Sequence, residues 1–375
     1  MNMEKQLNFY PLSPMQQGML FHALAARKRG VDVEQIFCTT PEALEAAAFE
    51  RAWQRVVDRH AILRTTFHWA GLDEPHQEVH PQATVEFRFE DWRAKSPAEQ
   101  KNLSETALHA DRQRGFDLTE RPPMRVALFR LGNSNSQFLW TFHHLLLDGR
   151  AVVLVLNEVF AFYEAFRRGE DLELPPLQPF REYLDWLQQQ DWSMAETFWR
   201  RTLKGFAAPT PPGVTYASDQ EVEPIRGEQE IDLSQSVTAA LKSLARKNGL
   251  TPNTVLQGAW ALLLSRYGRE QDVVFGAIRA GRRSNVPGAG AIVGLLINTV
   301  PVRVRVAPEQ PLVAWLQTLR QSWNALRDFE HTPLVKIQSW SEVPHGQPLF
   351  ETIFNYQDPS WDAALRAQGG KWAQR

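Results

Sequence analysis

The chain has 375 residues, of which 43% are hydrophobic and 22% are charged, and its formal net charge is −2. This length can bury one large or two ordinary hydrophobic cores. The near-neutral charge and the lack of a long basic run argue against a nucleic-acid-binding surface. Cys38 is the only cysteine, which excludes an internal disulfide and fits a reducing cytoplasm. The sequence shows no signal-peptide pattern and no apolar run of membrane-spanning length, so we expect neither secretion nor a membrane partner.

The first part of the chain predicts an alternation of helices and strands. Ser13, Pro14 and Gln16 open a helix, because serine caps it, proline fits the first helical position and glutamine completes a capping box. Ser96 and the glutamate three residues later repeat this pattern. Further elements are expected as helices at 42–59, 97–115 and 152–169 and as strands from residue 63 and at 124–131 and 137–142.

The second part repeats the theme after two proline-rich stretches, at residues 174–179 and 208–213. We place a domain boundary near residue 175, which gives lobes at 1–175 and 176–375. The expected elements are a helical segment at 180–203, helices at 234–247, 251–268 and from 311, and strands at 272–278, 300–306 and 350–356.

The stretch from Phe142 to Gly149 connects a predicted strand to a predicted helix and carries His143, His144 and Asp148. Neighbouring strand residues point to opposite faces of a sheet, so one histidine should face a cavity and the other should be buried. The pair does not predict a metal site, because no third ligand stands at a suitable spacing. Asp148 could orient His144 or pair with a buried arginine. Taken alone, the stretch is about as compatible with a structural role, as a buried histidine pair followed by a capping aspartate, as it is with a functional site.

Arg64 is the candidate partner for the aspartate. It stands among apolar and β-branched residues, where it is either a surface arginine on an edge strand or a buried partner of a carboxylate. We predict a pair between Arg64 and Asp148, because an unpaired charge in apolar surroundings is costly. The glycines at 288–294 do not have the GxGxxG spacing of a dinucleotide site.

The ordered motifs of the chain resemble those of the condensation domains of nonribosomal peptide synthetases, in the chloramphenicol-acetyltransferase-like superfamily. The string HHLLLDG at residues 143–149 is similar to the family's HHxxxDG motif. The other similar stretches are residues 13–22, 59–67, 183–186 and 292–303 and, more loosely, 331–334 and 347–350. The resemblance implies an α/β fold of the α+β sandwich type, with two similar lobes in a V-shaped pseudo-dimer and a tunnel between them. Family members usually continue well past the last motif, so we expect the C-terminal lobe to be incomplete.

The resemblance also implies the reaction and the partners. The amine of an aminoacyl acceptor would attack a donor acyl or peptidyl thioester, as in the biosynthesis of peptide antibiotics. Both substrates would arrive on the 4′-phosphopantetheine arms of upstream and downstream peptidyl carrier proteins, next to an adenylation domain in the bacterial cytoplasm. The domain itself is expected to bind no cofactor or metal and to be a monomer.

Within this pattern, His144 is expected to be the catalytic residue, as a general base or by positioning the amine. The supporting active-site residues would be His143, Asp148, Gly149 and Arg64, and the Gly149 N–H at a helix start could stabilise developing negative charge. Residues expected to lie along the tunnel are Ser13, Gln16 and Asn298.

Two other functions stay open. One is an acyltransferase of the same superfamily that uses acyl-CoA and a soluble alcohol or amine, although the DFGWG string of the plant-type members is absent from this chain. The other is a condensation-like domain that has lost catalysis and only recruits carrier proteins or other partners. Such domains usually lose a motif histidine, whereas His143 and His144 are both present.

Overall fold

The computed structural model describes residues 8–25, 30–213, 227–282 and 286–357 of the chain. It divides into two compact units, each with its own sheet and helices, which confirms the expected α/β class. Of the described residues, the first unit takes those up to Gln190, those between Arg282 and Ile297 and Gln357, and the second takes those of Asp191–Gly281 and Asn298–Tyr356. In the part of the chain that the structure describes, no helix combines the length and apolarity needed to cross a bilayer.

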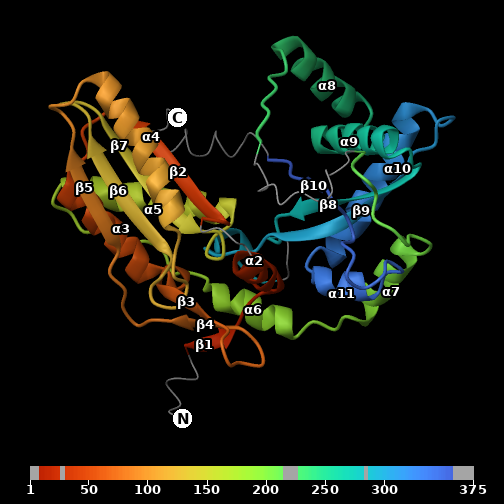
Figure 1. The fold of residues 1–375 in the computed structure, drawn as a ribbon, viewed down its shortest axis with the longest axis horizontal. Helices are drawn as coiled ribbons and strands as arrows, with labels where there is room; N and C mark the ends of the chain where they lie inside the picture. Colours follow the sequence, from red (N-terminus) through yellow and green to blue (C-terminus); the bar gives the residue numbers. More distant parts are fainter. Residues whose placement is uncertain (1–7, 26–29, 214–226, 283–285, 358–375) are drawn as a thin grey trace, which may run out of the picture. The chain divides into compact units, whose positions relative to one another are not determined.

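The main sheet of the first unit has four strands (Figure 1). Their order is β2 (Val33–Thr40), β7 (Ser136–His143), β6 (Met124–Arg130) and β5 (Glu86–Asp91). Strand β7 is antiparallel to both of its neighbours, and its register places His143 opposite Val33 of β2. A smaller sheet has the order β1 (Phe9–Pro11), β4 (His76–Val79) and β3 (Thr65–His68). The first motif histidine, His143, is therefore the last residue of a central strand.

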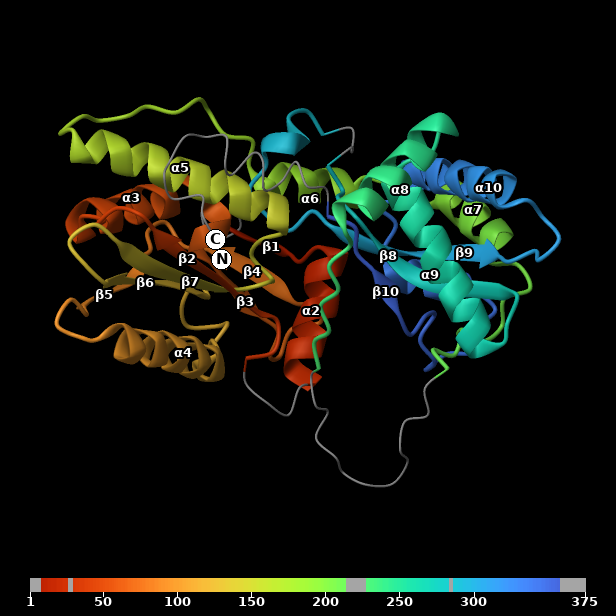
Figure 2. The same ribbon diagram turned by 90° about the horizontal axis from the view of Figure 1, so that it is seen from above.

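Helices cover both faces of the four-stranded sheet. Helices α3 (Ala46–Arg59) and α5 (Gly149–Arg167) lie on one face, and α4 (Pro97–Arg114) lies on the other (Figure 2). Trp53 of α3 and Trp140 of β7 are fully buried with ring centroids 4.9 Å apart. The predicted capping box of α4 is confirmed, since Ser96 Oγ accepts the Glu99 N–H and the Glu99 side chain accepts the Ser96 N–H. The face that carries α3 and α5 is thus closed by aromatic packing.

Four shorter elements complete the described part of the first unit. They are α2 (Pro14–Ala25), the 3-10 helix η1 (Ala61–Arg64), α6 (Phe180–Gln188) and a further 3-10 turn η2 (Ala289–Ala291). The strand expected from residue 63 begins only at Thr65, because residues 61–64 close a 3-10 turn first. The helical segment expected at 180–203 is two helices, of which the second belongs to the other unit.

The second unit contains a three-stranded sheet in the order β10 (Ile353–Phe354), β8 (Asp272–Arg279) and β9 (Asn298–Arg305). Its helices are α7 (Ser193–Leu203), α8 (Gln235–Lys247), α9 (Pro252–Gly268), α10 (Leu312–Ala325), η3 (Leu326–Phe329) and α11 (Leu334–Ser339). The core is separate from that of the first unit and includes Trp199, Phe275 and Trp315. Each unit can therefore bury its own apolar surface.

The chain returns to the first unit between β8 and β9. Residues Arg282–Ile297 are grouped with the first unit, as is α6, although the sequence-based division at residue 175 places both in the C-terminal lobe. The lobes at 1–175 and 176–375 stay a prediction. The V-shaped arrangement and the incomplete C-terminal lobe stay predictions.

Candidate active site

His143 is the buried member of the histidine pair. Its residue exposure is 4%, and its Nδ1 accepts the Leu145 N–H at 3.2 Å. Burial lowers the pKa of His143 to about 4, against a smaller raising effect of the nearby Asp32 carboxylate. The imidazole is therefore neutral near pH 7, and its buried position suits a residue that shapes the turn.

His144 lies one residue beyond the end of β7 and is half-buried. Its N–H donates to the Asp32 carbonyl at 2.8 Å. Its Nδ1 is buried and has no hydrogen-bond partner in the described part of the chain. Its Nε2 is not buried in this way. Nε2 is thus the ring nitrogen available to a substrate. The burial of the two histidines differs because the strand ends between them, and not only because side chains alternate along a strand.

Ser13 and Gln16 lock the first turn of α2 to the turn that carries His144. Ser13 Oγ accepts the Gln16 N–H at 3.1 Å, and Gln16 Oε1 accepts the Ser13 N–H at 2.9 Å, so the predicted capping box is confirmed. Gln16 is fully buried, and its Nε2 donates to the Leu145 carbonyl at 3.1 Å. A second glutamine, Gln77 of β4, donates to Gln16 Oε1 at 3.0 Å. These bonds fix the backbone directly after His144.

Asp148 caps α5 and at the same time binds the segment between β8 and β9. Its Oδ1 accepts the Ala151 N–H at 2.9 Å and an N–H of Arg282 at 2.6 Å. Its Oδ2 accepts the Leu296 N–H at 3.0 Å, and its own N–H donates to the Gly294 carbonyl at 3.2 Å. With 1% exposure, the carboxylate is a buried anchor for two segments.

The predicted pair between Asp148 and Arg64 is wrong. The partner is Arg282, which also donates to the carbonyls of Ala289 and Ile292. Arg64 instead donates to backbone carbonyls, those of Val57, His80 and Pro81. Its apolar flanks show only that it is partly buried, and carbonyl oxygens can satisfy a buried guanidinium as well as a carboxylate can.

Arg282 and its loop were missed because the glycines around them suggested only a weak nucleotide motif. Gly294 has a different reason to be glycine. A Cβ at this position would lie 2.4 Å from the Phe180 ring of α6, so the close approach excludes any side chain. The carbonyl of this glycine is the one that receives the Asp148 N–H. The sequence signal that could have indicated this partner of Asp148 was an arginine shortly before a glycine-rich loop.

Asn298 opens β9 in the second unit. Its Nδ2 donates to the carbonyls of Glu330 and Thr332 at 2.9 and 2.8 Å. Glu330 in turn accepts two N–H groups of the buried Arg279 on Oε2, at 2.8 and 2.5 Å. In this unit Asn298 therefore secures the turn that carries residues 330–332.

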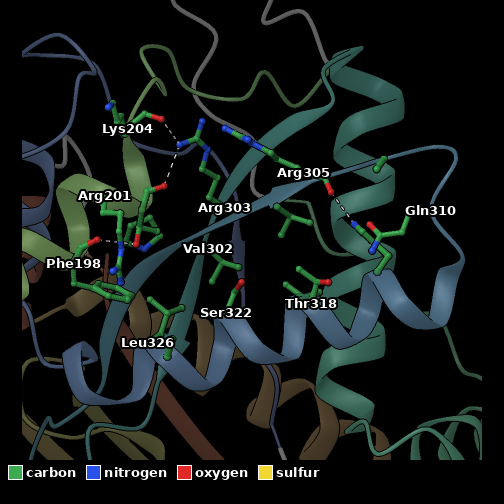
Figure 3. A pocket seen from close by; sticks show the side chains of 17 residues that line it. Phe198, Arg201, Lys204, Val302, Arg303, Arg305, Gln310, Thr318, Ser322 and Leu326 are labelled. Atoms are coloured by element: carbon green, nitrogen blue, oxygen red, sulfur yellow. Dashed lines mark hydrogen bonds between the residues drawn. The ribbon is translucent and has the colours of Figure 1, made fainter.

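One cavity lies within the second unit. It has a volume of about 690 Å³ and is bounded by β9, α10 and the end of α7 (Figure 3). Arg303 on its wall is paired with Asp272, and Trp315 Nε1 donates to the Arg305 carbonyl. None of the predicted site residues lines this cavity. Among the described residues, no cluster of three or more histidine, cysteine or carboxylate side chains could hold a metal ion.

Comparison with known proteins decides the family. The family model named Condensation domain matches residues 6–371. The chain belongs to the condensation domain family. A linear gramicidin synthase polypeptide of Brevibacillus parabrevis is 46% identical over 364 residues, which cover 97% of this chain and 7% of that protein. Bacitracin synthase 3 of Bacillus licheniformis is 33% identical over 362 residues, which cover 96% of this chain and 6% of that protein. The condensation domain thus spans less than a tenth of the length of these two relatives.

Solved structures support the same fold. The starter condensation domain of rhizomide synthetase, in complex with C8-CoA and Leu-SNAC, superposes with a TM-score of 0.78 at 22% identity and covers 95% of this chain and 79% of its own. The X-domain from teicoplanin biosynthesis superposes with a TM-score of 0.75 at 25% identity, covering 92% and 76%. The family recognised from the ordered motifs is confirmed.

Proposed function

We propose that this condensation domain forms an amide bond between a donor acyl or peptidyl thioester and the amine of an aminoacyl thioester acceptor. The observation that carries the proposal is the setting of His144. Its Nε2 is open, its Nδ1 is enclosed, and the backbone on either side is held by Asp32 and Gln16. An imidazole fixed in this way suits proton acceptance or positioning of an amine.

The reaction balances with this chain's own groups. The acceptor nitrogen attacks the thioester carbon, and the new C–N bond leaves a proton on nitrogen that Nε2 of His144 accepts. The C–S bond then breaks, and the leaving thiolate takes up that proton. General-base assistance is typically worth about 10²–10⁴-fold, and a free α-amine with a pKa of about 7.7–8.0 is partly neutral at pH 7. Gly149 begins α5, and the partial positive charge at the N-terminus of this helix would stabilise the oxyanion of the tetrahedral species that the attack forms.

In this proposal both thioesters are carried on 4′-phosphopantetheine arms. The partners are an upstream and a downstream peptidyl carrier protein and an adjacent adenylation domain, in the cytoplasm of a bacterium, and the domain acts as a monomer. The names of the relatives support this context, because they are synthases far longer than this chain. His143, Asp148 and Gly149 would support catalysis, and Ser13, Gln16 and Asn298 would lie along the tunnel that the resemblance implies.

A choice of donors and acceptors tests the proposal. The chain is incubated with an aminoacyl acceptor carrier or a soluble alcohol as the acceptor and with one acyl group presented as a carrier thioester or as a CoA thioester. The mass of the acceptor is then measured by mass spectrometry. We expect amide on the acceptor carrier, formed fastest with the carrier-bound donor. Faster ester formation from acyl-CoA and a soluble alcohol would support the acyltransferase alternative. Carrier binding without any product would support the recruiting alternative.

A further inference from the structure

Helix α2 holds the His144 turn at two points. In its first turn, Gln16 donates to the Leu145 carbonyl, as described above. In its last turn, Nδ1 of His22 lies 2.9 Å from Oδ2 of Asp32, and the Asp32 carbonyl accepts the His144 N–H at 2.8 Å. Helix α2 thus acts on the backbone after His144 at the Leu145 carbonyl and on the backbone before it at the His144 N–H. The Gln16 contact is direct, and the other contact runs through Asp32.

The backbone of Asp32 has an unusual conformation. Its φ of +54° lies in the left-handed region, and the only other described non-glycine residue with positive φ is Arg269, the C-cap of α9. Helix ends commonly accommodate such a residue, but Asp32 lies in the turn before β2. Among residues other than glycine, asparagine and aspartate tolerate this region best. Because Val33 pairs with His143, the left-handed turn at Asp32 extends the strand pairing by one hydrogen bond, to His144.

The carboxylate of Asp32 has its own anchor. A carboxylate only accepts hydrogen bonds, so the contact with His22 requires the hydrogen on Nδ1 of His22. The Asp32 side chain is 21% exposed and that of His22 is 67% exposed. The next residue is also fixed, because Arg112 of α4 donates to the Val33 carbonyl at 2.7 Å. The turn is therefore held by side chains from α2 and from α4.

We propose that Asp32 is a positioning residue for His144 and that His22 holds Asp32 in the required conformation. Neither residue reaches the reacting atoms in this account. A small rotation of the turn would move Nε2 of His144, and a misplacement of about 1 Å can slow a reaction about 10²-fold. The inference rests on the proposed function, since its kinetic consequence is a slower amide-forming step.

A series of substitutions at Asp32 separates the backbone from the side chain. Asp32→Asn keeps both the tolerance of positive φ and an oxygen acceptor, so kcat should stay within about 3-fold of wild type. Asp32→Gly keeps the backbone but loses the acceptor, and His22→Ala loses its donor, so each should lower kcat about 10-fold. Asp32→Ala loses the acceptor and disfavours positive φ, and kcat should fall about 100-fold with KM nearly unchanged. Asp73→Ala, in an exposed turn, is the matched control.

The position of His144 is also measured without turnover. Its ring C–H signal is assigned in the NMR spectrum by its loss in His144→Gln. This signal should move in Asp32→Ala and His22→Ala and stay in place in Asp32→Asn and Asp73→Ala. Circular dichroism confirms folding, and if Asp32→Ala does not fold, Asp32→Gly and His22→Ala carry the test.

Two sets of results would overturn the inference. One is an unmoved His144 signal together with kcat within 2-fold of the Asp73→Ala control in the Asp32→Gly and His22→Ala variants. The other is an equal loss in Asp32→Asn and Asp32→Ala, which would show that the negative charge matters and not the conformation. A wild-type chain that forms no amide would refute the proposed function instead, and the NMR signal would still decide whether Asp32 positions His144.

Discussion

Arg282 donates to the carboxylate of Asp148 at 2.6 Å across 134 residues of sequence, and both side chains are almost fully buried. Asp148 belongs to the histidine motif, and Arg282 is the first residue of the segment that ends at Ile297. The same carboxylate receives the Leu296 N–H. The motif aspartate therefore joins the turn that carries His144 to the segment between β8 and β9, within the first unit.

The first prediction concerns this ion pair. Arg282→Ala leaves Asp148 with backbone partners only, and removing one member of a buried pair typically costs about 3–5 kcal/mol of unfolding free energy. Asp148→Ala should cost a similar amount and also remove the cap of α5. Arg64→Ala, which leaves only neutral carbonyls behind, should cost less, about 1–3 kcal/mol. Melting temperatures of the three variants give the order. A larger loss in Arg64→Ala than in Arg282→Ala would contradict the assignment.

The second prediction concerns Gln16. Gln16→Ala removes the donor to the Leu145 carbonyl and leaves buried groups without partners, at a cost of about 1–3 kcal/mol. Amide formation should slow as well, because the turn after His144 loses its support. Gln17→Ala is the matched control on the exposed side of the same helix; it loses only a long hydrogen bond to the Leu12 carbonyl, at 3.4 Å, so its stability should change by less than about 0.5 kcal/mol and its rate should not change. Indistinguishable behaviour of the two variants would refute the role of Gln16.

The third prediction concerns pH. Because burial lowers the pKa of His143 to about 4, the unfolded chain takes up a proton between about pH 6.5 and pH 4 that the folded chain does not. Stability should therefore fall as the pH drops through this window, by about 3 kcal/mol at about 1.4 kcal/mol per pKa unit, and His143 should contribute nothing above it. His143→Asn keeps an acceptor for the Leu145 N–H and cannot titrate. Urea unfolding at about pH 7 and about pH 4.5 should show the steeper loss in the wild type, and parallel losses would count against the assignment.

The fourth prediction concerns Asn298. Asn298→Ala leaves the carbonyls of Glu330 and Thr332 without their donor, so the turn at 330–332 should open more often. Hydrogen exchange should accelerate there by about 10-fold or more, since about 1.4 kcal/mol corresponds to a factor of ten. Asn324→Ala, on the exposed face of α10, is the control. Faster exchange confined to the first unit would contradict this role.

Much of the local structure could be predicted because it depends on short-range chemistry. The capping boxes at Ser13 and Ser96 specify two helix starts from residues three apart, and both are confirmed. Strand β7 follows from a run of aromatic and apolar residues, and helix α5 follows from apolar residues at helical spacing. The burial of His143 agrees with the expectation that the two histidines would have different surroundings.

The partners of buried charges could not be predicted in the same way. Asp148 and Arg64 looked complementary because both stand among apolar residues, but burial does not identify the partner. Arg282 lies in a polar, glycine-rich stretch whose packing depends on the approach of Gly294 to Phe180, a contact between distant parts of the chain. The hold of α2 on His144 through Asp32 likewise depends on the three-dimensional turn, since positive φ at an aspartate leaves no pattern in the sequence.

Removal of the His144 imidazole tests its proposed role in amide formation. The chain is mixed with a donor-loaded and an acceptor-loaded carrier protein, and the amide formed in a single turnover is followed by mass spectrometry for the wild type, His144→Ala and the exposed control His109→Ala. We expect His109→Ala to match the wild type and His144→Ala to be slower by about 10²–10⁴-fold, with an unchanged circular dichroism spectrum. A His144→Ala variant that forms the amide at the wild-type rate would contradict the account.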